Sequence, residues 1–171
     1  MTDHLRTQPM LRAMFAVLLL ATFAGVSLAP SDAFAEDGTK VVYHADFADP
    51  RRFSAMLTSI NNMVTYYQNE LMEYDVRIVF VAHGIRFVTD DKLVGTPFEE
   101  DAEMAERRQN NAGRLDALRA VQGVKLELCG ITRSQINLAE DKLYEGVTMV
   151  PSGVVQLAKL QAEGFAYIKI E

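Results

Sequence analysis

The sequence predicts an α/β protein with a parallel sheet covered on both faces by helices. Short apolar runs alternate along the chain with longer segments whose apolar residues are spaced by three and four positions. One run, residues 76–82 (VRIVFVA), is almost uniformly apolar, as expected for a strand that is buried on both faces. Capping and turn residues stand between the two kinds of segment. Strands that alternate with helices favour parallel pairing, because each helix returns the chain to the same end of the sheet.

Residues 1–35 have the pattern of a signal peptide. A weakly basic start precedes residues 13–29, an apolar stretch without a charge, and small residues stand at Ala33 and Ala35, where a signal peptidase reads the chain. We expect cleavage after Ala35. This leaves a single domain at residues 36–171, which is expected to be periplasmic or secreted. The alternative is an uncleaved N-terminal membrane anchor, although the stretch is shorter than the roughly 20 residues of a spanning helix.

Charge and cysteine content exclude several classes of function. The formal net charge is −6 and no block rich in lysine or arginine occurs, so nucleic acid is not an expected partner. After residue 35 no apolar stretch is long enough to cross a membrane. Cys129 is the only cysteine and cannot form an internal disulfide. Its thiol is therefore buried and inert, paired between chains, or used chemically.

The first half of the domain is expected to contain two strands and two helices. The strands are residues 40–45 (KVVYHA) and 76–82. Between them, Asp49 and Pro50 suit an N-cap and a first helical residue. The helix they begin has one continuous apolar face, formed by Phe53, Met56, Leu57, Ile60, Met63, Val64, Tyr67 and Leu71. The second helix is expected to begin at the capping box of residues 96–99 (TPFE).

The second half is expected to complete the sheet with three more strands. Gly113 is a candidate break in the second helix, and Gly123 is expected to end it. The remaining elements follow from alternation, capping and turn residues: a strand at 124–128 (VKLEL), a short helix at 132–140, a strand at 146–150, a helix capped by Ser152 and closed by Gly164, and a last strand at 165–170 that suits a sheet edge.

The candidate site lies at the carboxyl ends of the strands, where parallel sheets bind their ligands. This rule selects His44, the pair His83-Gly84, the pair Cys129-Gly130 and the pair Ser152-Gly153. A helix start next to Cys129 favours its thiolate, while a small buried hydrophobic residue is an equal alternative.

The other residues at these strand ends have simpler alternatives. His44 or His83 is a candidate base or hydrogen-bond partner for the thiol, or a polar cap of a strand end. Ser152 and Gly153 suit anion binding at a helix start, or ordinary capping. Neither a metal set nor a nucleotide motif is present in the sequence, and no cofactor is expected.

Several of these stretches resemble DsrE/DsrF-like (YchN-like) proteins. The resemblance lies in residues 123–138 (GVKLELCGITRSQINL), in residues 146–170, which begin GVTMVPSGVV, and in the first strand and helix with His44 and Asn62. Residues 79–87 (VFVAHGIRF) are similar to the family's second strand and its His-Gly turn. The resemblance implies a three-layer sandwich with a central, mostly parallel five-stranded sheet. It also implies a homo-oligomer, often a trimer or hexamer.

The resemblance also suggests a chemistry for the cysteine. Members of the sulfur-relay branch carry sulfur as a persulfide, and the corresponding residue here is Cys129. The first hypothesis is therefore an exported sulfur carrier or sulfurtransferase that exchanges sulfur with a donor or acceptor protein. In it, His83 or His44 orients or deprotonates Cys129, and Gly84, Gly130, Ser152 and Gly153 line the site. The alternative is a non-catalytic oligomeric module that binds a small anion or a protein, with Cys129 in the core.

Overall fold

The structure, a computed structural model, describes residues 38–171. The signal peptide expected at residues 1–35 lies outside this range. The elements follow in the order β1 (Thr39–Ala45), α1 (Pro50–Asn69), β2 (Tyr74–Phe80), the 3-10 helix η1 (Ala82–Phe87), α2 (Ala102–Ala120), β3 (Lys125–Cys129), α3 (Gly130–Gln135), the 3-10 helix η2 (Glu140–Lys142), β4 (Val147–Val150), α4 (Gly153–Ala162) and β5 (Ala166–Ile168).

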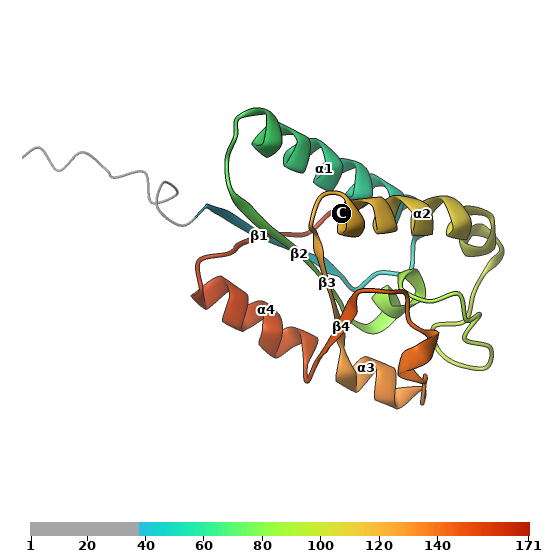
Figure 1. Cartoon of the computed structure of the whole chain (residues 1–171). Helices are drawn as coiled ribbons and strands as arrows, with labels where there is room; N and C mark the ends of the chain where they lie inside the picture. Colours follow the sequence, from blue (N-terminus) through green and yellow to red (C-terminus); the bar gives the residue numbers. More distant parts are fainter. Residues whose placement is uncertain (1–37) are drawn as a thin grey trace, which may run out of the picture. The chain divides into compact units, whose positions relative to one another are not determined.

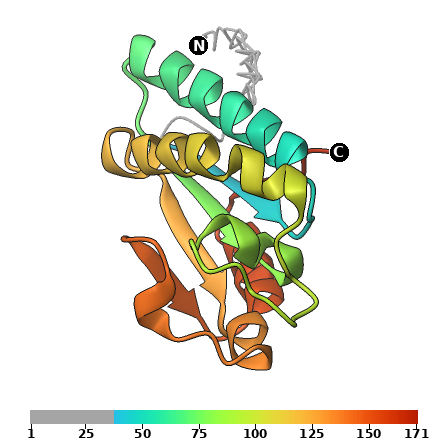
Figure 2. The same cartoon turned by 90° about the vertical axis from the view of Figure 1, so that its right-hand side faces the viewer.

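The strands form one sheet in the order β4-β3-β2-β1-β5, and every neighbouring pair is parallel. The predicted α/β class with a five-stranded sheet is confirmed. Ala45, Phe80, Leu128 and Met149 lie side by side across four strands. The carboxyl ends of β1 to β4 therefore meet at one edge of the sheet (Figure 2). The last strand lies at the outer edge next to β1, as its position in the sequence suggested.

Helices cover the two faces of the sheet unequally. Figure 1 shows α1 and α2 on one face and α4 on the other. The α1/α2 face holds the larger apolar cluster, in which the rings of Phe53 and Phe87 stack at a centroid distance of 4.0 Å. The α4 face holds a smaller cluster of Val42, Val79, Leu157, Leu160 and Phe165. The fold is therefore a three-layer sandwich whose main core lies under α1 and α2.

The start of α1 agrees with its sequence signals. The Asp49 carboxylate accepts hydrogen bonds from the N–H groups of Arg51 at 2.7 Å and Arg52 at 3.2 Å, and Pro50 is the first helical residue. These bonds satisfy two of the donors that a helix start leaves free. The predicted apolar face is buried at Phe53, Met56, Leu57, Ile60 and Val64. This burial fixes the helix on the sheet. The inclusion of Leu71 in this face is wrong, because the residue lies beyond the end of α1 and is exposed.

The prediction that the second helix begins at residues 96–99 is wrong. Helix α2 begins after Asp101, whose carboxylate accepts the N–H of Met104 at 2.8 Å. Thr96 and Glu99 instead close a turn, because the Thr96 hydroxyl donates to the Leu93 carbonyl and the Glu99 carboxylate accepts the N–H of Gly95. The polar groups of a capping box were thus present but satisfied without a helix.

Other boundaries differ from the expectation by a few residues. Gly113 does not interrupt α2, which continues to Ala120. The short helix after β3 begins at Gly130 rather than residue 132 and ends at Gln135. The second strand begins and ends two residues earlier than expected, because residue 82 already belongs to η1. The Ser152 cap of α4 is confirmed, since its hydroxyl oxygen accepts the Val155 N–H at 3.4 Å.

Two glycines allow a matched test of packing. A Cβ at Gly84 would lie 2.0 Å from the carbonyl oxygen of Ala45, whereas a Cβ at Gly113 would meet no atom within 4 Å. We predict that Gly84→Ala lowers the free energy of unfolding by more than about 2 kcal/mol, because backbone atoms must separate. Gly113→Ala should raise it by about 0.5–1 kcal/mol through helix propensity. Urea unfolding of both variants measures this, and equal midpoints would contradict the packing at Gly84.

Candidate functional site

The only cysteine lies where a strand, a short helix and the start of a longer helix meet. Cys129 is the last residue of β3 and the N-cap of α3, and it pairs with Val150 of β4. The Cβ of an alanine at Gly153, the first residue of α4, would lie 3.0 Å from the Cβ of Cys129. Glycine at this position therefore allows the first turn of α4 to approach the cysteine.

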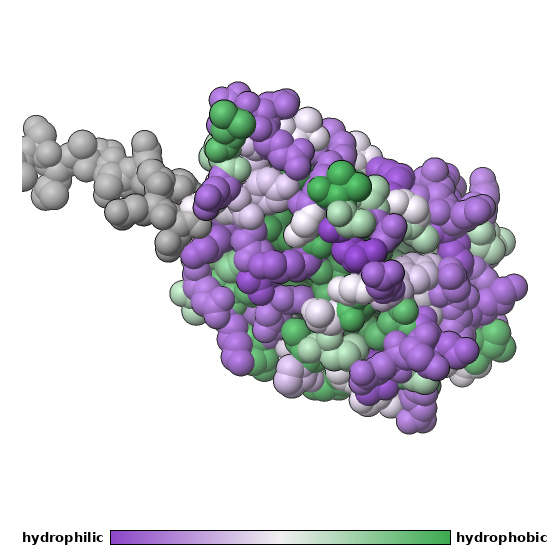
Figure 3. Space-filling view, in the orientation of Figure 1, coloured by the Kyte–Doolittle hydropathy of each residue, from purple (hydrophilic) through white to green (hydrophobic). Residues whose placement is uncertain are grey.

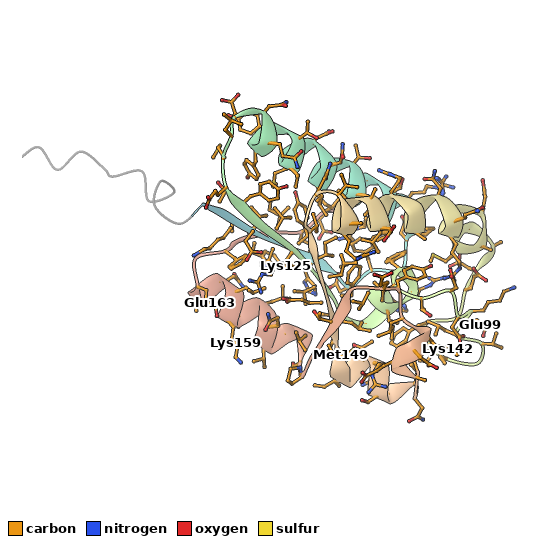
Figure 4. All side chains as sticks on the ribbon, in the orientation of Figure 1. Glu99, Lys125, Lys142, Met149, Lys159 and Glu163 are labelled. Atoms are coloured by element: carbon orange, nitrogen blue, oxygen red, sulfur yellow. The ribbon has the colours of Figure 1, made fainter. Side chains whose placement is uncertain are left out.

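The alternation of β3 places the cysteine on the α4 side of the sheet. Leu126 and Leu128 belong to the apolar cluster under α1 and α2. Lys125, Glu127 and Cys129 alternate with them and so occupy the opposite face. Lys125 is labelled in Figure 4, on the side of β3 that carries α4. The predicted split of this strand into an apolar and a polar face is confirmed.

The surroundings of the sulfur favour its thiolate. Burial by itself raises the pKa of the Cys129 thiol, since it penalises the charged form. Interactions with the N–H groups of Gly153, Thr132 and Ile131 outweigh burial, together with that of the Thr132 hydroxyl. The pKa is therefore lowered below its ordinary value. The sulfur accepts no capping hydrogen bond from the first turn of α3, so these groups act chiefly as nearby dipoles.

Cys129 is not exposed at the edge of the sheet in this single chain. The residue is only 4% exposed. The residues that follow it and Gly153 are open to solvent, however, with Ile131 54% and Val154 65% exposed. Cys129 also belongs to neither of the two apolar clusters. It is thus a buried thiol outside both apolar clusters, and residues next to it and to Gly153 in the sequence are exposed.

Thr132 joins the cysteine to the end of the neighbouring strand. It is 4% exposed, and its hydroxyl oxygen accepts the N–H of Ala82 at 3.0 Å. Ala82 has a left-handed φ of 48° and begins η1, with Val81 between it and the end of β2. This backbone conformation costs a residue with a Cβ about 1–2 kcal/mol. The turn that brings Ala82 to Thr132 is therefore strained, which is common next to functional sites.

His44 lies on β1, and β2 separates it from β3. Two strand spacings amount to about 10 Å. Its Nδ1 is 2.9 Å from the hydroxyl of Tyr167, and its Nε2 is 3.9 Å from Asp46, which also binds Lys169. Burial lowers the pKa of His44, Asp46 raises it, and Lys169 lowers it, with a net decrease below the ordinary value. His44 therefore favours its neutral form near neutral pH.

His83 lies in η1 and contacts the ring of Phe98 edge to face at 5.2 Å. Its Nδ1 is buried and has no hydrogen-bond partner. Within residues 38–171, no recorded hydrogen bond, ion pair or ring contact joins either histidine to Cys129. A role of His44 or His83 as a base for the thiol stays a prediction.

The predicted glycines and serine have structural reasons for their identity. Gly84 packs on the Ala45 carbonyl, and a Cβ at Gly130 would lie 3.1 Å from the Val150 carbonyl oxygen. Ser152 caps α4. Gly130, Ser152 and Gly153 therefore border Cys129, whereas Gly84 stands at the joint between β1 and η1.

The positive charge of Arg133 is not directed at the thiol. Its guanidinium donates to the Leu138 carbonyl at 2.6 Å and lies 3.4 Å from Glu140. Arg133 is also absent from the groups that shift the pKa of Cys129. The thiolate is therefore favoured by neutral dipoles rather than by a neighbouring cation.

Sequence reasoning missed a polar network on the same sheet face. Glu127 is buried and accepts hydrogen bonds from Arg77 at 3.0 Å and from Gln156 of α4 at 2.9 Å. Arg77 also pairs with Asp75. The charged positions of β2 and β3 alternate with apolar ones, and this was the available signal. The network helps to attach α4 to the sheet and so to hold Gly153 near Cys129.

A separate cavity of about 540 Å³ lies between α2, β3 and the segment before β4. Leu115 and Leu126 line it, and both belong to the cluster on the α1/α2 face, so the cavity is on the side of the sheet opposite to Cys129. Figure 3 shows mixed polar and apolar residues on the side of the molecule that carries α2 and β4. The cavity and the cysteine are therefore two distinct features.

Residues 38–171 lack two further classes of feature. No group of three or more histidine, cysteine, aspartate or glutamate side chains is arranged to hold a metal ion. No helix in that range has the length and apolar character needed to span a membrane.

Comparison with known proteins agrees with this architecture. The model of the DsrE/DsrF-like family matches residues 34–170. The chain belongs to the DsrE/DsrF-like family. This family is associated with sulfur relay in general, and the resemblance inferred from the sequence is confirmed. No curated protein matches the chain.

Two solved structures are similar to this DsrE/DsrF-like chain. One is MTH1491 from Methanobacterium thermoautotrophicum, a protein of unknown function, with 26% identity, a TM-score of 0.57 and coverage of 77% of this chain and 98% of that one. The other is the YchN protein of E. coli, with 17% identity, a TM-score of 0.48 and the same coverage of both chains. The first of these supports the fold.

The contact between Gly153 and Cys129 generates a prediction. In Gly153→Ala the new Cβ would lie 2.5 Å from Val81 Cγ2 as well as against Cys129, so the start of α4 should move outward. We expect a loss of about 1–3 kcal/mol in unfolding free energy and a higher thiol pKa, because the Gly153 N–H withdraws. Thiolate absorbance followed against pH, with Cys129→Ser subtracted, measures the pKa.

Val154→Ala provides the control, since this side chain is exposed one residue further along α4. It should leave both the stability and the thiol pKa close to those of the wild type. A Gly153→Ala protein that titrates like the wild type would show that the start of α4 does not govern the thiol.

Proposed function

We propose that this DsrE/DsrF-like protein carries sulfur as a persulfide on Cys129. The observation that carries the proposal is the lowered pKa of a thiol held between the end of β3 and the first turn of α4. The thiolate, not the thiol, is the nucleophile in exchange between sulfur atoms. The family's association with sulfur relay supports the same chemistry.

The proposed exchange is balanced without a further oxidant. The Cys129 thiolate attacks a sulfane sulfur of a polysulfide, a new S–S bond forms, and the donor's S–S bond breaks. The shortened polysulfide leaves with the electron pair. In delivery, an acceptor thiolate attacks the outer sulfur of the persulfide, and Cys129 leaves as the thiolate. One sulfur atom enters and one departs, so the protein acts as a carrier or a transferase.

The surroundings of Cys129 suit an anionic sulfur that forms and breaks bonds to other sulfur atoms. N–H groups of Gly153, Thr132 and Ile131 provide partial positive charge, and no metal or cofactor takes part in the proposed steps. Because Cys129 is 4% exposed, the donor must be small or the first turn of α4 must open. Ile131 in α3 and Val154 in the first turn of α4 are exposed. The lowered pKa increases the fraction of thiolate, and this effect involves no contact with a histidine.

A second candidate function follows from the burial of Cys129. A buried thiol suits a non-catalytic module in which the residue only packs, and free cysteine is often buried. The 540 Å³ cavity beside α2 would then be the main feature for binding. The lowered pKa favours the persulfide function, since a purely packing cysteine in apolar surroundings has a raised pKa.

The persulfide proposal is tested by loading folded protein with a polysulfide. We predict the gain of one sulfur atom on the peptide that contains Cys129, detected by mass spectrometry and removed by reductant. Cys129→Ser should show no gain while keeping its circular dichroism and unfolding midpoint. If the wild type stays unmodified and its thiol reacts with an alkylating reagent only after denaturation, the binding-module function replaces the carrier function.

We also propose that the protein acts outside the cytoplasm after removal of residues 1–35. The support is the sequence pattern alone, with an uncharged stretch at 13–29 and small residues at Ala33 and Ala35. N-terminal sequencing of the protein from its native source should find Glu36 first. An intact Met1 on membrane-bound protein would indicate the anchor instead. Assembly into a homo-oligomer likewise stays a prediction.

A further inference from the structure

We propose that the cavity beside α2 is a docking groove for a basic amphipathic helix of a partner protein. This α2 groove is the open space of about 540 Å³ between α2, β3 and the segment before β4. It lies on the face of the sheet opposite to Cys129, so the inference does not rest on the persulfide function. It follows from the length, the apolar floor and the charge of the groove.

The α2 groove has the length of a helical segment. The α2 residues that line it extend from Ala105 to Arg119. At a rise of about 1.5 Å per residue, these two positions are about 21 Å apart along the helix axis. About four turns of a second helix match this length, whereas a compact small molecule would fill only a part of it. The groove therefore suits a helix that lies along α2 and inserts its side chains.

The floor of the groove is an apolar part of the sheet that α1 and α2 leave partly open. Leu115 and Leu126 line the groove, and Val147 and Met149 of β4 pack against the same apolar cluster but are only partly buried. Figure 1 shows β4 apart from α2, and Figure 3 shows apolar surface between these two elements with polar residues around it. A helix with one apolar face would continue the layer of α1 and α2 and cover this surface.

The arginines of the groove are outnumbered by carboxylates. Arg108 lies 2.8 Å from Glu100, and both side chains are largely buried, so this pair is neutral within the protein. Arg119 is shared by two exposed carboxylates, Asp116 at 2.7 Å and Glu145 at 3.8 Å. One guanidinium group thus faces two carboxylates at this end of the groove, which leaves an excess of negative charge.

The negative charge continues at the other side of the groove. The Asp90 carboxylate accepts the Tyr144 hydroxyl at 2.7 Å, and no ion pair recorded within residues 38–171 includes Asp90. Asp91 and Asp141 line a smaller cavity that shares Asp90 and Tyr144 with the groove. An apolar floor between carboxylates is complementary to a helix whose leucine-like face is bordered by lysine or arginine.

A partner protein suits the groove better than a second copy of this chain. The apolar faces of α1 and α2 are already buried, and α4 uses Leu157 and Leu160 in the same way. The formal net charge of −6 also makes a second copy a poor match for an acidic rim. The occupant is therefore a basic helix from a different protein.

A synthetic peptide tests the inference. The probe is a labelled helical peptide of about 18 residues that contains only leucine and lysine, with leucine at every third and fourth position. We expect saturable binding of one peptide per chain in fluorescence anisotropy, and this binding should weaken when the salt concentration rises. A peptide of the same composition without an apolar face, and a leucine–glutamate peptide with one, should bind at least about tenfold more weakly.

Two substitutions with matched controls locate the binding. A Cβ at Gly113 would meet no atom within 4 Å, so Gly113→Leu should fill the groove without unfolding α2 and weaken binding about tenfold. Asn110→Leu adds the same side chain to an exposed position of α2 that does not line the groove, and should bind like the wild type. Glu145→Lys should weaken binding about three- to tenfold. Glu163→Lys, at the end of α4 (Figure 4), makes the same change in net charge and should not weaken it.

The outcomes separate the occupants and the two functions. Wild-type affinity in Gly113→Leu would overturn the inference, as would an equal effect of Glu145→Lys and Glu163→Lys, which would indicate attraction by net charge alone. Absence of peptide binding would also overturn it. If light scattering then shows that Gly113→Leu lowers the mass of an oligomer, a second copy covers the groove. Cys129→Ser should bind the peptide like the wild type, so a failure of sulfur uptake leaves this inference intact.

Discussion

The parallel register of the sheet is the constraint on which the candidate site depends. Because Ala45, Phe80, Leu128 and Met149 align across four strands, β1 to β4 end together, and each following segment leaves from the same edge. The end of β2 can then contact the segment after β3, and the segment after β4 can contact the end of β3. The thiol of Cys129 is surrounded by groups from three crossovers that no local stretch of sequence contains.

The competition between burial and dipoles decides the character of Cys129. Burial is the largest single influence on its pKa and acts against the thiolate. Several neutral donors act in the opposite direction and prevail together. Two of these donors depend on packing. Gly153 can approach Cys129 because it has no side chain, and the Thr132 hydroxyl oxygen accepts the N–H of Ala82. The site is therefore sensitive to small movements of α4 and η1, although neither element supplies a charged group to the sulfur.

The fold could be predicted from the sequence because its signals are local and agree with one another. Asp49 and Pro50 begin α1 as expected, and the alternation of residues 124–128 gave the correct faces of β3. The capping box at residues 96–99 failed because a turn satisfies the same polar groups. The burial of Cys129 and the bond between Ala82 and Thr132 depend on approaches between distant segments, which periodicity and capping rules do not describe.

A thiolate held by neutral donors differs from one held by a histidine cation. An imidazolium would neutralise the sulfur, and its own titration would impose a second pH dependence. His44 is instead held on β1 with Tyr167 and Asp46, and its lowered pKa keeps it neutral. In the proposed exchange, the site would therefore retain one negative charge when the donor's anion leaves and the persulfide forms. The same N–H groups can serve both anions, so the proposed loading and delivery would require no change in the protonation of the surrounding residues.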